Sequence, residues 1–332
     1  MKRNIIVLFV LLITSIANAD LIYQYQVDYQ FCRDFFKTNN NNFLLNANGG
    51  AFFYKDKLSA PVFIDLSSHK MFCISHFRDN STMILFDYGY QGQGKGELNT
   101  PYDVVVNSNA EAFISDSGNN RIVKVQIDFV KHMNKVLETW GAGTNEDKQI
   151  GFSNPHRIAL DRTGNIYVAD TGNNRIVVLD NSGKVLREIG KNNQLNAPFG
   201  VTVSLNDVIT VADTGNGFLQ QFDINGNFIR KIGWVTGVPD RYNYYSVAAD
   251  SKGNVYVVDS LNDNIYEFAP DLSSLLSTYP GIPEIKFGIK GEIVIPARRF
   301  KNLRAITFNL NRDTKGRFYD TNAMVIEARN VI

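Results

Sequence analysis

Short segments in which apolar and polar residues alternate recur along most of the chain. The clearest four, PHRIALD, GNIYVAD, RIVVLD and KVLREIG, lie between residues 155 and 190 and carry the β-branched and aromatic residues typical of strands. The joints DRTGN, DTGNN and DNSGK supply glycine, asparagine and aspartate, which tolerate the positive φ of tight turns. This pattern predicts four short antiparallel strands joined by three tight turns.

The same unit recurs at a regular spacing. An aspartate that follows a proline by fifteen residues marks two units, in the pairs Pro101 with Asp116 and Pro155 with Asp170. The same offset locates further units at Pro198 with Asp213, at Tyr244 with Asp259, and at Pro61 with His76, where the aspartate is lost. A weaker unit lies at 291–311. Six units are therefore expected, beginning near residues 61, 101, 155, 198, 244 and 282.

Six units of four strands predict an all-β fold, a six-bladed β-propeller of four-stranded antiparallel blades. A single small sheet cannot bury both of its faces, whereas sheets packed radially around an axis bury all of them. A parallel β-solenoid is the alternative, and it is disfavoured because its coils are shorter and lack three hairpin signals in each repeat. We expect the propeller to span residues 59–332, with a cap or closing strands at 20–58.

One unit carries a family resemblance. Residues 151–190 are similar to an NHL repeat, with its P-x-x-I-A-x-D opening, its Y-V-A-D centre and its G-N-x-R-I step. The units that begin near 97 and 194 match in part, and the other units are degenerate. The resemblance implies an NHL-type β-propeller of the kind found in bacterial extracytoplasmic proteins, some of which serve as sensors or bind other proteins. It does not imply an activity, because one fold serves many functions.

Uniform polar residues surround the second turn of the best units. A carboxylate there can accept turn N–H groups, and a guanidinium can reach it from the next strand, which predicts a structural staple. A ring of catalytic or metal-binding carboxylates is the alternative, and repetition disfavours it because a catalytic site needs a residue only once. The expected staple residues are Asp116, Asn119 and Arg121 in one unit and Asp170, Asn173 and Arg175 in the next.

The residues just after each anchor differ between units. They open the innermost strand, and in propellers this edge lines the mouth of the central channel. Aromatic rings with a few polar groups at a concave mouth suit a peptide or glycan ligand. The alternative is that the aromatic rings wedge adjacent blades apart. The expected ligand-binding residues are Tyr102, Asp103, His156, Arg157, Phe199 and Tyr245, with Val62 and Phe63 at the same place in the first unit.

Metal-dependent propeller enzymes supply the alternative function. Amidating lyases, which this chain resembles in fold, hold zinc through three histidines, one of them in a step like Pro155-His156. The matching positions here carry Tyr102, Phe199 and Tyr245. Lactonase-like propellers bind calcium through several channel acids, and Asp103 is the one acid that we place there. We therefore assign no catalytic residue, no metal ligand and no cofactor, and we expect a recognition or scaffold propeller.

The first nineteen residues have the pattern of a signal peptide. Lys2 and Arg3 precede an apolar run at 5–13, and the small-x-small sequence at 17–19 predicts cleavage before Asp20. The apolar run is short for a bilayer span, which takes about 20 residues, so a membrane anchor is disfavoured. We expect an exported protein, periplasmic or extracellular, without a membrane span after processing.

Net charge restricts the class of partner, and the two cysteines bear on a possible disulfide bond. Removal of Lys2 and Arg3 leaves 32 of the 34 basic residues against 33 acidic ones, a formal net charge of −1. This balance provides no basic surface for nucleic acid. The expected partner is a protein, peptide or glycan of the cell envelope or exterior. The two cysteines, Cys32 and Cys73, can pair in an oxidising compartment or remain buried thiols, and the sequence leaves both open.

Overall fold

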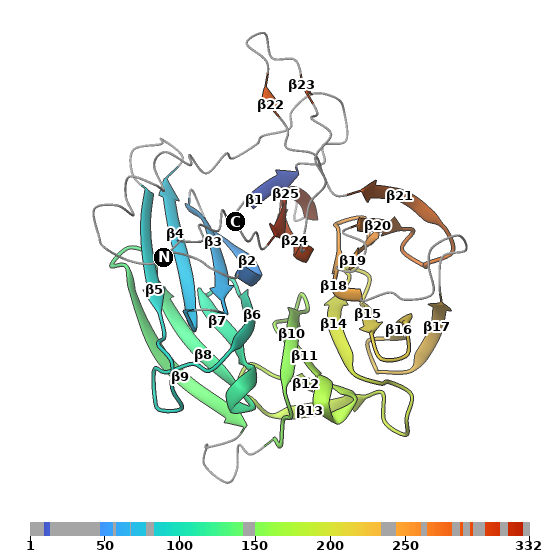
Figure 1. Cartoon of the computed structure of the whole chain (residues 1–332), viewed down its shortest axis with the longest axis horizontal. Coiled ribbons are helices and arrows are strands. Elements are labelled where there is room, and N and C mark those ends of the chain that lie inside the picture. Colours follow the sequence, from blue (N-terminus) through green and yellow to red (C-terminus); the bar gives the residue numbers. More distant parts are fainter. Residues whose placement is uncertain are drawn as a thin grey trace, which may run out of the picture.

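The described part of the chain is built from β-strands arranged around a central axis (Figure 1). A computed structural model describes residues 10–13, 47–55, 58–66, 68–77, 83–141, 150–233, 244–259, 264–280, 286–287, 293–294, 303–312 and 318–327. Within these residues it contains five antiparallel sheets of four strands each, and the strands of each sheet follow one another in sequence order. The fold is a β-propeller, as the sequence predicts.

Each four-stranded sheet is one blade. The first consists of β2 (Ala47–Lys55), β3 (Leu58–Asp65), β4 (Lys70–Phe77) and β5 (Met83–Tyr88), and the second of β6 (Pro101–Val106), β7 (Glu111–Asp116), β8 (Arg121–Asp128) and β9 (Met133–Gly141). The third consists of β10 (Pro155–Leu160), β11 (Ile166–Asp170), β12 (Arg175–Leu179) and β13 (Val185–Ile189), and the fourth of β14 (Pro198–Val203), β15 (Val208–Asp213), β16 (Phe218–Asp223) and β17 (Phe228–Gly233). The fifth consists of β18 (Tyr244–Ala249), β19 (Val255–Asp259), β20 (Asn264–Phe268) and β21 (Leu275–Pro280).

The two ends of the chain share a sixth sheet. It has three strands in the order β1 (Val10–Ile13), β25 (Phe318–Glu327) and β24 (Leu303–Arg312). Strand β24 packs against β2 and β18, so it completes a ring with the innermost strands of the five blades (Figure 1). A further pair, β22 (Lys286–Phe287) and β23 (Ile293–Val294), stands apart from this sheet.

The expectation of six four-stranded blades is therefore wrong in its count. The described residues form five, and the remaining sector holds a three-stranded sheet to which both ends of the chain contribute. The unit expected from residue 282 has lost the aspartate, asparagine and glycine that form the tight turns of the other units, and its strand β24 is paired with β25 instead. Strand β1 lies within the predicted signal peptide, whose removal would leave β24 and β25 in this sheet.

The first blade begins earlier than the sequence pattern indicates. Pro61 lies on the second strand, β3, and the residue opposite Asp65 is Ala47, just as Pro101 is opposite Asp116 in the second blade. Asp65, and not His76, is therefore the aspartate of this repeat. The boundary expected at residue 59 falls inside the blade, between β2 and β3. The error arose because β2 lacks the proline that anchors the three best units.

Apolar side chains fill the seams between neighbouring blades. Alternate residues of a strand point to opposite faces, so Phe113 packs toward the third blade and Ile114 toward the first. Phe113 stacks on the fully buried Trp140 with ring centroids 5.8 Å apart. Burial of each such side chain contributes about 2 kcal/mol to folding. The core therefore consists of successive layers between the sheets.

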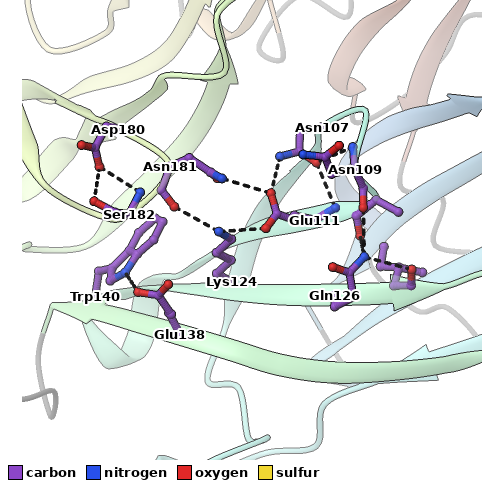
Figure 2. A network of polar contacts seen from close by, with 12 residues as sticks. Asn107, Asn109, Glu111, Lys124, Gln126, Glu138, Trp140, Asp180, Asn181 and Ser182 are labelled. Carbon is purple, nitrogen blue, oxygen red and sulfur yellow. Dashed lines mark hydrogen bonds and ion pairs between the residues drawn. The ribbon is translucent and has the colours of Figure 1, made fainter.

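A polar network also joins the second blade to the third (Figure 2). The Lys124 ammonium lies 2.9 Å from a carboxylate oxygen of Glu111 and donates to the carbonyl of Asn181 at 3.0 Å. The Asn181 side chain closes the network by donating to Glu111 at 3.2 Å. Because Asn181 lies in the turn between β12 and β13, this network fixes the outer hairpin of the third blade to β7 and β8 of the second.

Candidate functional site

A backbone irregularity lies near the start of four inner strands, β6, β10, β14 and β18. In β6, Pro101 is opposite Asp116 and Asp103 is opposite Ser115, so the register of the ladder shifts by one residue at Tyr102. The ladders of β10, β14 and β18 shift at the corresponding place. A β-bulge of this kind redirects a side chain away from the regular pleat. The second residue of each inner strand is therefore free to differ between blades.

Three of these bulge residues meet. We call Tyr102, His156 and Phe199 the mouth cluster, and they come from β6, β10 and β14. The His156 ring stacks on Phe199 with centroids 4.1 Å apart, and Tyr102 meets these two rings edge-on at 4.3 and 5.1 Å. His156 is buried, whereas Tyr102 and Phe199 are half-buried. The cluster thus presents two partly open aromatic rings beside a buried imidazole.

A threonine from the same blade fixes the tautomer of His156. The Thr171 hydroxyl donates to the carbonyl of Pro198 at 2.7 Å, so it can only accept at the 2.8 Å contact with Nδ1 of His156. Nδ1 therefore carries the hydrogen. Burial, together with the adjacent Arg157, lowers the pKa of His156 to about 3, so the ring is neutral at physiological pH. Since the histidine donates to Thr171, it does not act as a base toward this hydroxyl.

The two charged residues next to the mouth cluster pair with each other. Arg157 Nη1 lies 3.4 Å from Asp103 Oδ1, and only 3% of Arg157 and 6% of Asp103 are exposed. The other carboxylate oxygen of Asp103 accepts the N–H of Ile158 at 3.2 Å. Burial raises the pKa of the Asp103 carboxyl, and Arg157 and the Ile158 N–H oppose that shift. The pair therefore links the second and third blades and leaves little charge at the surface.

A glycine makes room for this pair. A Cβ at Gly49 of β2 would lie 2.1 Å from Oδ1 of Asp103 and 2.7 Å from its Cα, so no larger residue fits without movement. By register, Gly49 in the first blade corresponds to Asp103 in the second. The glycine of β2 thus leaves the space that Asp103 and its partner Arg157 occupy.

The predicted ligand-binding residues separate into three groups. Tyr102, His156 and Phe199 are together at the mouth, whereas Asp103 and Arg157 are buried beside them. Tyr245 occupies the same register position in β18, but its side chain is outside the described part of the structure. The placement of Val62 and Phe63 at the mouth is wrong, because both lie on β3 and are buried. Asn48 of β2 holds the register position assigned to them.

The second blade contains the expected staple. Asp116 is fully buried, and it accepts from Nε of Arg121 at 2.7 Å, from Nδ2 of Asn119 at 2.8 Å and from the N–H of Asn99 at 2.6 Å. The Arg121 guanidinium also donates to the carbonyl of Glu97 at 2.9 Å. The staple therefore does more than close its own hairpin, because it fixes the connection between the first two blades onto the second.

The third blade repeats this arrangement. Asp170 accepts from Arg175 Nε at 2.7 Å, from Asn173 Nδ2 at 2.9 Å and from the N–H of Ser153 at 2.7 Å. Arg175 also pairs with Glu188 at 2.9 Å. The three residues bond to one another and to the preceding connection, and Arg175 also reaches the outer strand β13 through Glu188.

Two further staples were missed from the sequence. In the fourth blade, Gln220 donates to Asp213 at 2.6 Å and takes the place of the arginine. It lies two residues farther along the strand than the arginine position, on the same face, which the period-two rule could have revealed. In the first blade, Ser68 donates to Asp65 at 2.6 Å. Its signal was the segment DLSSHK, which has the spacing of DSGNNR.

The remaining candidate chemistry is limited in the described part of the chain. No three or more histidine, cysteine, aspartate or glutamate side chains gather there as a metal site. Nor do those residues include a helix long and apolar enough to cross a membrane. Cys73 is buried, which raises the pKa of its thiol, while Cys32 lies outside the described residues. Its pairing with Cys73 therefore stays a prediction.

Comparison with known proteins agrees with this architecture. The family model for the NHL repeat matches residues 152–179, which begin just before β10 and end with β12 of the third blade. The third blade is thus similar to an NHL repeat, and the described sheets together form a β-propeller. NHL repeat-containing protein 3 from mouse is 34% identical over 97 residues, which are 28% of this chain and 26% of the relative. The human protein of that name is 32% identical over 87 residues, or 25% of this chain and 23% of the relative. The matched part of the chain thus spans about a quarter of the length of these relatives.

Solved structures share the fold at low sequence identity. Virginiamycin B lyase from Staphylococcus aureus has a TM-score of 0.52 and 14% identity, with 84% of this chain and 85% of that chain covered. A gluconolactonase from Xanthomonas campestris has a TM-score of 0.53 and 15% identity over 85% and 86% of the two chains. A chain of a nidogen and laminin complex has a TM-score of 0.51 and 18% identity over 70% and 79%. Enzymes and a binding protein therefore share this propeller architecture.

Proposed function

We propose that this NHL-repeat propeller is an exported recognition protein that binds its partner at the mouth cluster without catalysing a reaction. The observation that carries the proposal is the meeting of Tyr102, His156 and Phe199 from three neighbouring inner strands, with the rings of Tyr102 and Phe199 half-buried. Aromatic rings in a concave site supply contact area at a small cost in conformational entropy. The partner class is a peptide, protein or glycan of the cell envelope or exterior.

A wedging role accounts less well for these rings. The seams between the blades are filled by other apolar residues, and the three mouth-cluster residues belong to none of those clusters. They also lie at bulge positions, outside the regular ladders. Their truncation should therefore affect ligand binding more than folding.

Export rests on the signal-peptide pattern at residues 1–19. N-terminal sequencing of protein recovered outside the cytoplasm should begin at Asp20. Recovery of an intact Met1 would refute cleavage. Strand β1 lies inside the segment that cleavage would remove. If this segment contributes nothing to the folded protein, the mature protein and the full chain should unfold at similar temperatures.

The decisive experiment compares Tyr102→Ala and Phe199→Ala with Phe228→Ala on arrays of envelope peptides and glycans. Truncation of an aromatic anchor at a binding hot spot costs about 2 kcal/mol, or roughly a 30-fold loss of affinity. Phe228 is 48% exposed on the outer strand β17 and serves as the matched control. We expect weakened binding for the first two variants only, with similar melting temperatures for all three.

Two results would overturn this proposal. An equal loss of thermal stability in Tyr102→Ala and Phe199→Ala, with ligand affinity unchanged, would assign the rings to blade packing. Stoichiometric zinc or calcium in purified protein, together with turnover of a lactone or a peptide substrate, would establish the competing function of a metal-dependent propeller enzyme. Arg157 is unsuitable as a test position because its removal would leave the buried Asp103 carboxylate unpaired.

A further inference from the structure

The hydrogen bonds around His156 determine which of its nitrogens can meet a ligand. Nδ1 donates to Thr171, whose own hydrogen is committed to the Pro198 carbonyl. Nε2 makes no hydrogen bond to any residue that the structure describes. In the neutral ring it carries a lone pair and no hydrogen, so it can only accept. The mouth cluster therefore combines two aromatic rings with one oriented acceptor.

We propose that the mouth cluster binds an aromatic ring that carries its own hydrogen-bond donor, as the indole of a tryptophan-containing peptide does, and that Nε2 of His156 accepts that hydrogen. This inference rests on the proposed function and specifies the ligand for the same site. Tyr102 and Phe199 already hold the His156 ring in edge-on and stacked contacts, and their half-buried rings leave aromatic surface beside it for the ligand. Thr171 is a positioning residue, because it holds the His156 ring in the accepting tautomer.

The buried charges favour a peptide over a glycan. A glycan offers many hydroxyl groups, and a site that recognises them needs several open donors and acceptors. Here the strongest candidates, Asp103 and Arg157, are 6% and 3% exposed and pair with each other. A planar ring with a single donor matches the remaining surface better, because it leaves few polar groups without a partner.

The third blade differs from its neighbour in the use of the turn hydroxyl. Ser117 donates to the carbonyl of Pro155, as Thr171 does to that of Pro198. Position 102 in that blade is a tyrosine, which has no ring nitrogen to donate to Ser117. The hydroxyl therefore serves blade packing in both blades, and in the third it also orients an acceptor.

The tautomer can be tested without a ligand. Nitrogen NMR of the histidine side chains should show His156 protonated at Nδ1 in the wild type and in Thr171→Ser, which keeps the hydroxyl. Thr171→Val removes the acceptor, and a shift of the hydrogen to Nε2 is expected. A wild-type ring protonated at Nε2 would overturn the inference.

The ligand class is tested with a matched pair of probes, N-acetyl-tryptophanamide and its 1-methylindole analogue, in calorimetric titrations of the wild-type protein. The methyl group removes the donor and keeps the ring, so binding of the analogue should be about tenfold weaker. Thr171→Val should lose this discrimination, and Thr171→Ser should keep it. Equal binding of the two probes to the wild type would refute an acceptor role for His156.

The outcomes separate this inference from the proposed function. If neither probe binds but a glycan binds and loses affinity in Tyr102→Ala, the ligand class is wrong and the recognition function stands. If neither the indole probes nor the peptide and glycan arrays bind at Tyr102 and Phe199, both the inference and the proposed function fail.

Discussion

The buried imidazole of His156 should make folding stability depend on pH in a way that one substitution can isolate. Its pKa in the folded protein is about 3, whereas an unfolded histidine titrates near 6.5. The unfolded chain therefore binds the proton first as the pH falls. Stability is fully present above pH 6.5 and is lost progressively as the pH falls toward 3. Because His156 is only 8% exposed, solvent does little to weaken this effect.

The magnitude follows from the two pKa values. Between pH 7 and pH 5 the imidazole of the unfolded chain becomes almost fully protonated, while that of the folded protein stays neutral. The free energy of unfolding therefore falls by roughly 2 kcal/mol over this range. Burial also raises the pKa values of Asp103, Asp116 and Asp213, and those groups favour folding as the pH falls. The absolute stability of the wild type therefore does not report His156 alone.

Comparison of a variant with the wild type cancels the contribution of the other titrating groups to the pH dependence of stability. His156→Phe keeps a ring of similar shape and cannot titrate, so its free energy of unfolding should gain about 2 kcal/mol on that of the wild type between pH 7 and pH 5. Urea denaturation at each pH measures both proteins. Tyr102→Phe is the control, since it alters the same cluster without a group that titrates in this range. A constant difference between His156→Phe and the wild type across this range would refute the buried, neutral state of the imidazole.

Three further substitutions test the architecture by chemical denaturation. Arg121→Met leaves the buried Asp116 carboxylate without its guanidinium and should lower the free energy of unfolding by about 3–5 kcal/mol. Lys131→Met, in an exposed pair with Asp128, should lower it by almost nothing. Similar losses of stability in both variants would argue against the staple. Gly49→Ala places a Cβ 2.1 Å from Asp103 Oδ1 and should destabilise by about 1–3 kcal/mol, and a neutral result would contradict the close approach of β2 to β6. His69→Ala removes the acceptor for the Thr100 N–H and should lower the free energy of unfolding by about 1 kcal/mol. His69→Asn should retain stability, because Asn120 and Asn174 make the same contact in later blades. Equal losses of stability in the two variants would show that this hydrogen bond is unimportant.

The sequence was most informative where turn chemistry repeats. Asp161 accepts the N–H groups of Thr163 and Asn165, so the segment DRTGN is the tight turn that its composition predicts. The staples were predictable for the same reason, since each uses residues a fixed distance apart on one hairpin. Signals of this kind depend on a few neighbouring residues, so they can be recognised in the sequence without knowledge of the tertiary structure.

The first blade and the sixth sector were not predictable in this way. Strand β2 begins with Ala47, so an anchor defined by proline moved to Pro61 on the next strand. The three-stranded sheet joins segments from opposite ends of the chain, and pairing at that separation leaves no periodic trace in the sequence. The ion pair of Asp103 and Arg157 was likewise invisible, because it joins two blades and depends on the space left by Gly49.

The bonds between blades explain how a binding site can vary on a repeated scaffold. Asn120 and Asn174 accept the N–H of the residue before the next proline, and Ser117 and Thr171 donate to the proline carbonyl, so each turn is fixed to the blade that follows. These contacts hold the start of each inner strand through its backbone. The bulge residue that comes next lies where the register of the ladder shifts, so the regular strand pairing does not depend on the identity of its side chain. If the mouth cluster binds the proposed ligand, few substitutions are needed to change its specificity, because in the third blade a histidine stands beside a threonine that the scaffold already uses.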